Sequence, residues 1–137
     1  MLFTESKLRV SDNSGAVFVK CIKVPGSSKP RFARFGDQIV VSTRFVKPKH
    51  KVKEARRILK GAIYKALVVR TKKPVFMPDG SSIKFFENRV VLVKKAQPRT
   101  FGGPKLAGNR VFGPIISNKK FKKKFNKLFS LSSSILK

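Results

Sequence analysis

Residues 11–24, with the sequence SDNSGAVFVKCIKV, decide the fold class of this chain. The first five residues combine Asp, Asn, Ser and Gly, which favour a tight turn because they bond to nearby backbone or tolerate a positive φ. Residues 16–24, which follow, are rich in β-branched and aromatic side chains, and two lysines interrupt the run. The sequence therefore predicts a turn that leads directly into a strand.

Further strand-like runs follow the same plan. They are predicted near Leu8, near Val75, and at 38–46 (QIVVSTRFV), 62–70 (AIYKALVVR), 82–86 and 89–93 (RVVLV). The turn at 77–80 (MPDG) makes a hairpin, because Pro fixes one φ and Gly supplies a positive one. The run at 89–93 is apolar on both faces, as expected of a barrel strand. Several short strands between Gly/Pro turns before residue 95 predict a mainly β fold built on a small closed β-barrel.

Two later segments differ from this plan. Residues 48–60 form a basic connection, with one helical turn predicted around 54–60. A Gly/Pro-rich loop follows Val93, and a basic helix is predicted at 118–129. Its apolar stripe consists of Phe121, Phe125, Leu128 and Phe129. We expect this stripe to pack on the barrel, and the alternative is attachment to an anionic membrane surface. The serines near the C-terminus give no structural signal.

The length of the chain favours one domain. We expect 1–137 to form a single domain, with the barrel in 1–95 and a basic loop and C-terminal helical segment in 96–137. No apolar stretch approaches the roughly 20 residues that a membrane span requires.

The net charge is the strongest functional signal. The chain has 33 Lys and Arg against 6 Asp and Glu, a formal charge of +27, yet 41% of it is hydrophobic. A disordered basic tail would lack this apolar content, so a folded core with a polyanionic partner is expected. Three of the acids, Asp12, Asp37 and Asp79, lie close to a glycine and are predicted to form turns. The three glutamates are scattered, and each has a Lys or Arg within two residues in the sequence.

The inventory of reactive residues argues against an enzyme. The chain has one His, His50, and one Cys, Cys21, so no metal cluster or catalytic triad of known spacing is present, and no cofactor is predicted. Cys21 lies in an apolar run and is predicted to be a buried structural thiol rather than a reactive one. The glycines at 102–108 resemble a phosphate loop but lack its Gly-Lys-Ser/Thr ending.

Nucleic-acid binding accounts for the charge. Basic residues occur in every predicted connection, whereas solvated charged faces would carry balancing acids. Phe32, Phe35 and Phe101 lie among these cations and are candidates for stacking on bases, with packing as the alternative.

Several motifs then occur in a consistent order. They are SDNSGA at 11–16, CIKV at 21–24, GD at 36–37, KG at 60–61, KALVVRTKK at 65–73, PDGSSIKF at 78–85, NRVVLV at 88–93, RVFGPI at 110–115 and FNKLFSL at 125–131. With them, the chain resembles the universal large-subunit ribosomal protein fourteen family nearly from end to end.

This resemblance implies a five-stranded β-barrel with a projecting hairpin and a C-terminal loop with short helices. It implies a structural role, in which the protein binds large-subunit rRNA on the face that meets the small subunit and helps to form intersubunit bridges with small-subunit rRNA. The implied protein partners are the large-subunit proteins numbered three and nineteen in the bacterial scheme, together with a ribosome-silencing factor. Phosphate contacts would position the protein, with little base-specific readout.

The candidate site residues follow from the resemblance and from the basic runs. The predicted rRNA ligands are Lys23, Lys29, Arg31, Arg34, Lys49, Lys51, Lys53, Lys60, Arg70, Lys72, Lys73, Lys84 and Arg99. The predicted intersubunit or partner surface consists of Asn109, Arg110, Phe112, Lys124 and Lys127.

Departures from the family pattern bear on the location. Insertions near 54–59 and 99–108, Asn109 where Thr is usual, and a missing acid after the Phe-Gly-Pro motif favour a divergent mitochondrial ribosome. The excess of Lys over Arg and the 13 Phe are typical of A+T-rich genomes. No presequence precedes Leu8, so synthesis inside the organelle is expected. A plastid or a bacterial cytoplasm is the alternative location, and a free barrel-type RNA-binding factor is the alternative function.

Overall fold

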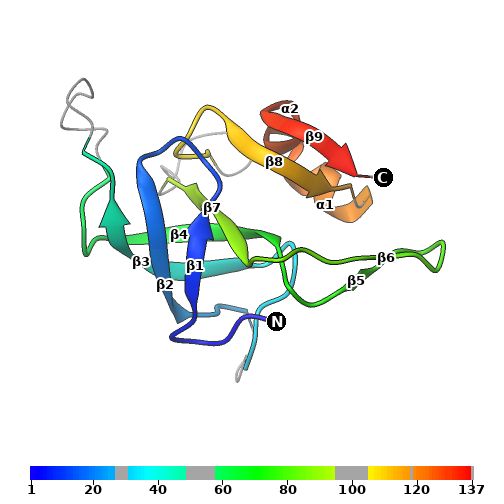
Figure 1. The fold of residues 1–137 in the computed structure, drawn as a ribbon, viewed down its shortest axis with the longest axis horizontal. Coiled ribbons are helices and arrows are strands. Elements are labelled where there is room, and N and C mark those ends of the chain that lie inside the picture. The colour runs from blue at the N-terminus through cyan, green and yellow to red at the C-terminus, as the bar shows by residue number, and fades with distance from the viewer. Residues whose placement is uncertain (27–30, 49–57, 95–104, 118, 137) are drawn as a thin grey trace.

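The fold is a closed five-stranded barrel with two attached units. The computed structural model describes residues 1–26, 31–48, 58–94, 105–117 and 119–136. The barrel strands are β1 (Lys7–Val10), β2 (Ala16–Lys23), β3 (Gln38–Val46), β4 (Ile63–Arg70) and β7 (Arg89–Val93), hydrogen-bonded in the order β1-β2-β3-β4-β7 (Figure 1). The barrel closes where β1 runs parallel to β7, and the other neighbours are antiparallel. The mainly β fold with a closed barrel is thus confirmed.

A hairpin projects from the barrel between β4 and β7. It consists of β5 (Val75–Phe76) and β6 (Ser82–Ile83), and it extends well beyond the barrel in Figure 1. The turn between them is closed by Asp79, whose Oδ1 accepts a hydrogen bond of 3.0 Å from Ser81 N–H. The predicted hairpin and its turn are therefore confirmed.

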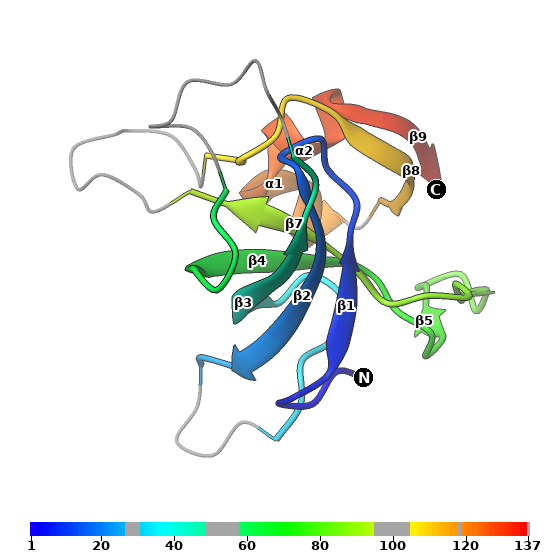
Figure 2. The same cartoon turned by 60° about the vertical axis from the view of Figure 1, so that its left-hand side comes forward.

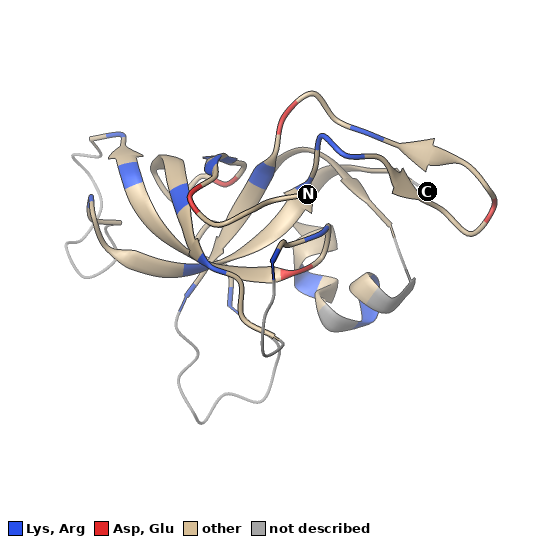
Figure 3. Ribbon diagram, turned by 90° about the horizontal axis from the view of Figure 1, so that it is seen from below, with Lys and Arg blue, Asp and Glu red and all other residues tan. Residues whose placement is uncertain are grey.

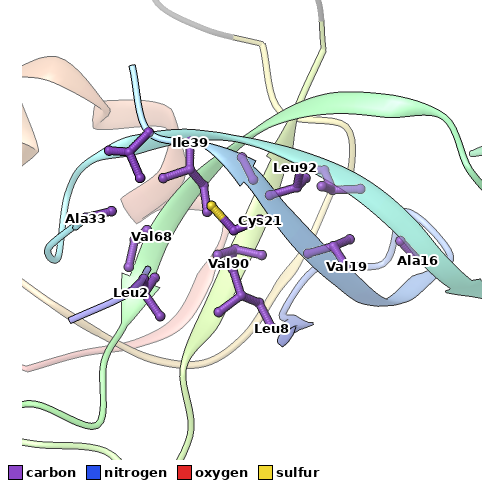
Figure 4. Packing of buried hydrophobic residues seen from close by; sticks show 13 residues of the cluster. Leu2, Leu8, Ala16, Val19, Cys21, Ala33, Ile39, Val68, Val90 and Leu92 are labelled. Carbon is purple, nitrogen blue, oxygen red and sulfur yellow. The ribbon is translucent and has the colours of Figure 1, made fainter. Parts of the chain in front are cut away.

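From Ala66 onward β4 is buried on both faces, as is β7 from Val90 onward, which explains the apolar runs in these parts of the two strands. One face lines the barrel interior through Ala66, Val68, Val90 and Leu92, and the other joins a second cluster through Leu67, Val69, Val91 and Val93. Because side chains alternate along a strand, a strand covered on both sides needs apolar residues at every position. In the interior, Cys21 lies among Ile39, Val90 and Leu92 (Figure 4), so its predicted burial is confirmed.

The second cluster is covered by a C-terminal lobe. This lobe consists of β8 (Val111–Ile116), α1 (Lys119–Lys124), α2 (Asn126–Ser130) and β9 (Ser132–Leu136), with β8 and β9 paired in parallel. Phe121 is the centre of the packing, with ring centroids 4.8 Å from Phe35, 5.1 Å from Phe125 and 5.5 Å from Phe129. The expectation that the apolar stripe packs on the barrel is confirmed.

Two details of this lobe correct the sequence-based expectations. The predicted helix at 118–129 is two short helices, because Phe125 adopts φ −132° and ψ 45°, outside the helical region. Strands β8 and β9 were not expected. The Ser-rich run that forms β9 and the Gly-Pro pair inside β8 both have low strand propensity. A register shift between Val111 and Pro114 accommodates the Gly-Pro pair in the ladder.

One loop prediction lies mostly outside the described residues. The helical turn predicted around 54–60 falls largely in 49–57, and Ile58, Leu59 and Lys60 are not helical.

Candidate nucleic-acid interface

The outer surface of the barrel has an apolar, covered half and an open, cationic half. The C-terminal lobe covers β4 and β7 (Figure 1), whereas the outward residues of β1, β2 and β3 are exposed or half-buried. Figure 2 shows these three strands side by side. We call the outer face of β1, β2 and β3 the open face.

Strand register arranges the open face in rows. One row runs from Lys7 on β1 to Lys20 on β2 and Ser42 on β3. The next runs from Arg9 on β1 to Phe18 on β2 and then to the neighbouring strand β3. Between these two rows Leu8 of β1 is paired with Val19 of β2, and both side chains point inward and are fully buried. Alternation along each strand thus places cations on the outside and apolar side chains in the core.

The two described glutamates both form ion pairs with basic residues. Glu87 lies 2.9 Å from both Arg9 and Arg89, and Glu5 pairs with Lys20. All these pairs are at least partly exposed, so each contributes little to stability, at most about 1 kcal/mol.

The three described aspartates accept hydrogen bonds from the backbone. Asp12 accepts from Ser14 N–H and Leu92 N–H, both at 2.8 Å, and Asp37 accepts from Arg34 N–H at 2.7 Å. Asp79 closes the hairpin turn as described above. The turn-forming role predicted for all three is confirmed, and Asp12 also links the turn to β7. The exposed Lys and Arg residues are spread along the ribbon and greatly outnumber the acids (Figure 3).

Seven of the predicted rRNA ligands are exposed in the structure. They are Lys23 at the end of β2, Arg31 and Arg34 before β3, Lys60 before β4, Lys72 and Lys73 after β4, and Lys84 in the hairpin. Arg34 lies 5.1 Å above the ring centroid of Phe32, and Lys73 Nζ lies 3.6 Å from Met1 Sδ. The predicted ligands Lys29, Lys49, Lys51, Lys53 and Arg99 lie outside the described residues.

Arg70 differs from the other predicted ligands and is corrected. It is only 8% exposed, its Nε donates to the Pro114 carbonyl at 2.9 Å, and its terminal nitrogen donates to the Phe112 carbonyl. Burial lowers the pKa of Arg70, and the nearby Arg89 lowers it further. Because β8 lies over this end of β4, the guanidinium holds the lobe on the barrel instead of facing a phosphate.

The predicted partner surface lies at the start of β8 and on the helices. Asn109, Arg110 and Phe112 are exposed. Asn13 Oδ1 accepts from Asn109 N–H at 2.8 Å and Arg110 N–H at 3.2 Å, so the turn at 11–14 positions this segment. Lys127 on α2 is also exposed. The side chain of Lys124 lies outside the described part of the structure.

The aromatic candidates are placed unequally. Phe35 is half-buried against Phe121, which matches the packing alternative, and Phe32 is half-buried between Arg34 and Phe3. Phe101 lies outside the described residues.

Sequence reasoning missed the cations of the open face. Lys7, Arg9, Lys20 and Arg44 lie on β1, β2 and β3, whereas most of the predicted ligands lie in connections between strands. The alternation of basic and apolar residues in β1 (KLRV) is the signal that identifies such a face.

Within the described ranges, no group of three or more His, Cys, Asp and Glu could hold a metal ion. The helices found there are also too short and too polar to cross a membrane.

Comparison with known families agrees with this architecture. The model of the family described as ribosomal protein L14p/L23e matches residues 1–136. The match covers nearly the whole chain, including both the barrel and the C-terminal lobe. Proteins of this family are structural components of the ribosome and not enzymes. The chain therefore belongs to the ribosomal protein L14p/L23e family and is a protein of the large ribosomal subunit.

Proposed function

We propose that this protein binds large-subunit rRNA close to the face that meets the small subunit, and that it contributes to intersubunit bridges. The observation that carries the proposal is the imbalance of charge at the surface. Exposed Lys and Arg side chains occur on the barrel strands, the hairpin and the lobe, whereas every described acid is already engaged by a cation or a backbone N–H. Such a surface requires a polyanion close to it.

The rRNA contacts would be made mainly to phosphates. Lys23 ends β2, Lys60 precedes β4, and Lys72 and Lys84 lie in the segment that contains the hairpin, so these lysines can contact several rRNA segments at once. Each phosphate neutralised releases a counterion and adds about −0.7 to −0.9 to the slope of log affinity against log salt. Binding of this kind holds the protein in place without reading base sequence.

The start of β8 and the exposed face of α2 would serve as the partner surface. Arg110, Phe112 and Lys127 combine two cations with an exposed ring, which suits contact with small-subunit rRNA and with neighbouring proteins. The neighbours proposed are the large-subunit proteins numbered three and nineteen in the bacterial scheme. A ribosome-silencing factor is a further proposed ligand of this surface.

We place the protein in a mitochondrial ribosome. The proposal rests on the composition, with Lys more than twice as frequent as Arg and 13 Phe, and on the insertions near 54–59 and 99–108. A plastid or bacterial ribosome is the alternative.

Lysine footprinting on purified ribosomes tests the rRNA contacts and the bridge together. Lysine acylation would be quantified by mass spectrometry in the free chain, in isolated large subunits and in joined ribosomes. Lys23, Lys60 and Lys72 should react in the free chain and be shielded in isolated large subunits, because rRNA already covers them. Lys127 should react in isolated large subunits and become shielded after the small subunit joins.

Two results would overturn the proposal. If the chain sediments apart from large subunits at high Mg²⁺, it acts as a free RNA-binding factor. If Lys127 reacts equally before and after joining, this surface does not contribute to a bridge.

A further inference from the structure

Two exposed phenylalanines lie side by side on the open face. Phe18 of β2 and Phe45 of β3 are directly paired in the strand register, and they are 38% and 57% exposed. Side chains of such a cross-strand pair point to the same face with Cβ atoms about 5 Å apart. The pairing of β2 with β3 changes register on both sides of Phe18, which indicates a β-bulge in each strand. Two large apolar rings therefore face solvent together at one end of β3.

Cations surround this pair. The Arg9 guanidinium lies 5.3 Å from the ring centroid of Phe18, and Arg44 and Lys20 are neighbours of the pair along the two strands. Arg9 is itself oriented by its 2.9 Å contact with Glu87. The site thus combines two exposed aromatic rings with a guanidinium over one of them.

We propose that Phe18, Phe45 and Arg9 form a stacking site for an unpaired base of the bound RNA. This inference rests on the proposed function and deepens it, because it adds a contact to a base where the loops supply contacts to phosphates. Bases stack on aromatic rings and on guanidinium planes, while nearby Lys and Arg bind the flanking phosphates. Duplex RNA buries its bases, so the ligand is a nucleotide in a loop or bulge.

The composition of the face favours RNA over a protein partner. The cores of protein–protein interfaces are depleted in charged residues, and Lys in particular is rare there. On the open face, Lys7, Lys20 and Lys23 lie on β1 and on β2, the strand that carries Phe18. The two described glutamates nearby are already paired, so an acidic ligand meets no repulsion from them.

A tryptophan substitution reports on the site directly, because the chain contains no Trp. Phe45→Trp would be titrated with single-stranded oligoadenylate and, separately, with inorganic polyphosphate, which carries the charge but no bases. We expect oligoadenylate to quench the emission of the introduced tryptophan and polyphosphate to leave that emission unchanged. The control is Phe76→Trp in the projecting hairpin, where the native ring is 75% exposed. Its emission should change little with either ligand.

Affinity gives a second measurement. Phe45→Ala should weaken binding of oligoadenylate by roughly 5- to 150-fold, the loss typical of one stacked base, and leave polyphosphate binding unchanged. Phe45→Tyr should retain the affinity, because it keeps an aromatic face. The slope of log affinity against log salt should stay the same in both variants, since no cation is removed.

The outcomes separate this inference from the proposed function. If Phe45→Ala leaves oligoadenylate binding unchanged while the chain still joins large subunits, the stacking site is wrong and the proposed function stands. A crosslink from position 45 to a protein in the assembled subunit would also overturn it. If the unmodified chain binds neither polyanion, the proposed function itself fails.

Discussion

Asp12 offers a sharp test of how the N-terminal turn is joined to the rest of the barrel. Its side chain is 6% exposed, and its two oxygens accept hydrogen bonds from Ser14 N–H within the turn and from Leu92 N–H in β7, both at 2.8 Å. Asp12→Asn keeps the shape of the side chain but replaces one oxygen with an NH₂ group. Because NH₂ cannot accept from a backbone N–H, one donor in this region loses its partner.

The expected loss of stability follows from these contacts. Leaving a buried donor unpaired costs about 1–3 kcal/mol, and the hydrogen bond that remains loses a charged acceptor, which costs roughly 1 kcal/mol more. The free energy of unfolding should therefore fall by about 2–4 kcal/mol, a large share of the roughly 5–15 kcal/mol typical of a domain.

Equilibrium unfolding in urea, followed by circular dichroism, measures this loss. With a slope of about 2 kcal/mol per molar urea, the midpoint should fall by roughly 1–2 M and the slope should stay constant. The matched control is Asp79→Asn. Asp79 has the same turn geometry, with Oδ1 accepting from Ser81 N–H at 3.0 Å, but it is exposed and has no bond to a distant strand. It should lower the midpoint far less than Asp12→Asn does, because the bonds that it weakens are exposed and local. Equal midpoints for the two variants would refute the role given to the bond between Asp12 and Leu92.

Three smaller predictions concern a turn, the core and the barrel–lobe contact. Hydrogen bonds from the side chain and backbone of Ser81 lower the pKa of Asp79, so its NMR titration midpoint should lie below that of a free Asp, and Ser81→Ala should raise it. Because the folded-state pKa is depressed, the stabilisation is present above the unfolded-state pKa and is lost as pH falls through the folded-state value; an unshifted midpoint would contradict this. Burial raises the pKa of the Cys21 thiol, so an aromatic disulfide reagent should label the native protein far more slowly than the unfolded chain, and equal rates would argue against a buried thiol. Gly36→Ala and Gly61→Ala both place Ala at a positive φ, 86° and 81°, at a cost of roughly 1–2 kcal/mol, but only at Gly36 does a phenyl carbon of α1 lie 3.2 Å from the added Cβ. Thermal unfolding should show the larger loss for Gly36→Ala, and equal losses would mean that the ring moves aside freely.

Much of the barrel could be predicted because its signals are local. The strand predicted at 38–46 coincides with β3, and those at 16–24 and 62–70 differ from β2 and β4 by one residue each. Alternation and β-branched residues act within a few positions, and turn residues mark where a strand ends. The apolar run at 89–93 also indicated correctly that β7 is covered on both faces.

The C-terminal lobe could not be predicted in the same way. Strand β9 contains Ser132, Ser133 and Ser134, which have no strong strand preference, and it forms because β8 offers a parallel edge. The helix break at Phe125 lets that ring and Phe129 both pack on Phe121. In both cases packing against distant residues overrides local preference.

The sequence alone was sufficient to predict the family, the barrel strands and a polyanionic partner. These predictions rest on strand propensity, periodicity and net charge, which depend only on the types and order of the residues. Tertiary structure decided which cations remain available. It buries Arg70 beneath β8, where its pKa is lowered, and it brings Arg9, Phe18 and the distant Phe45 into one exposed row. Exposure depends on which elements cover a strand, and that depends on contacts between residues far apart in the chain.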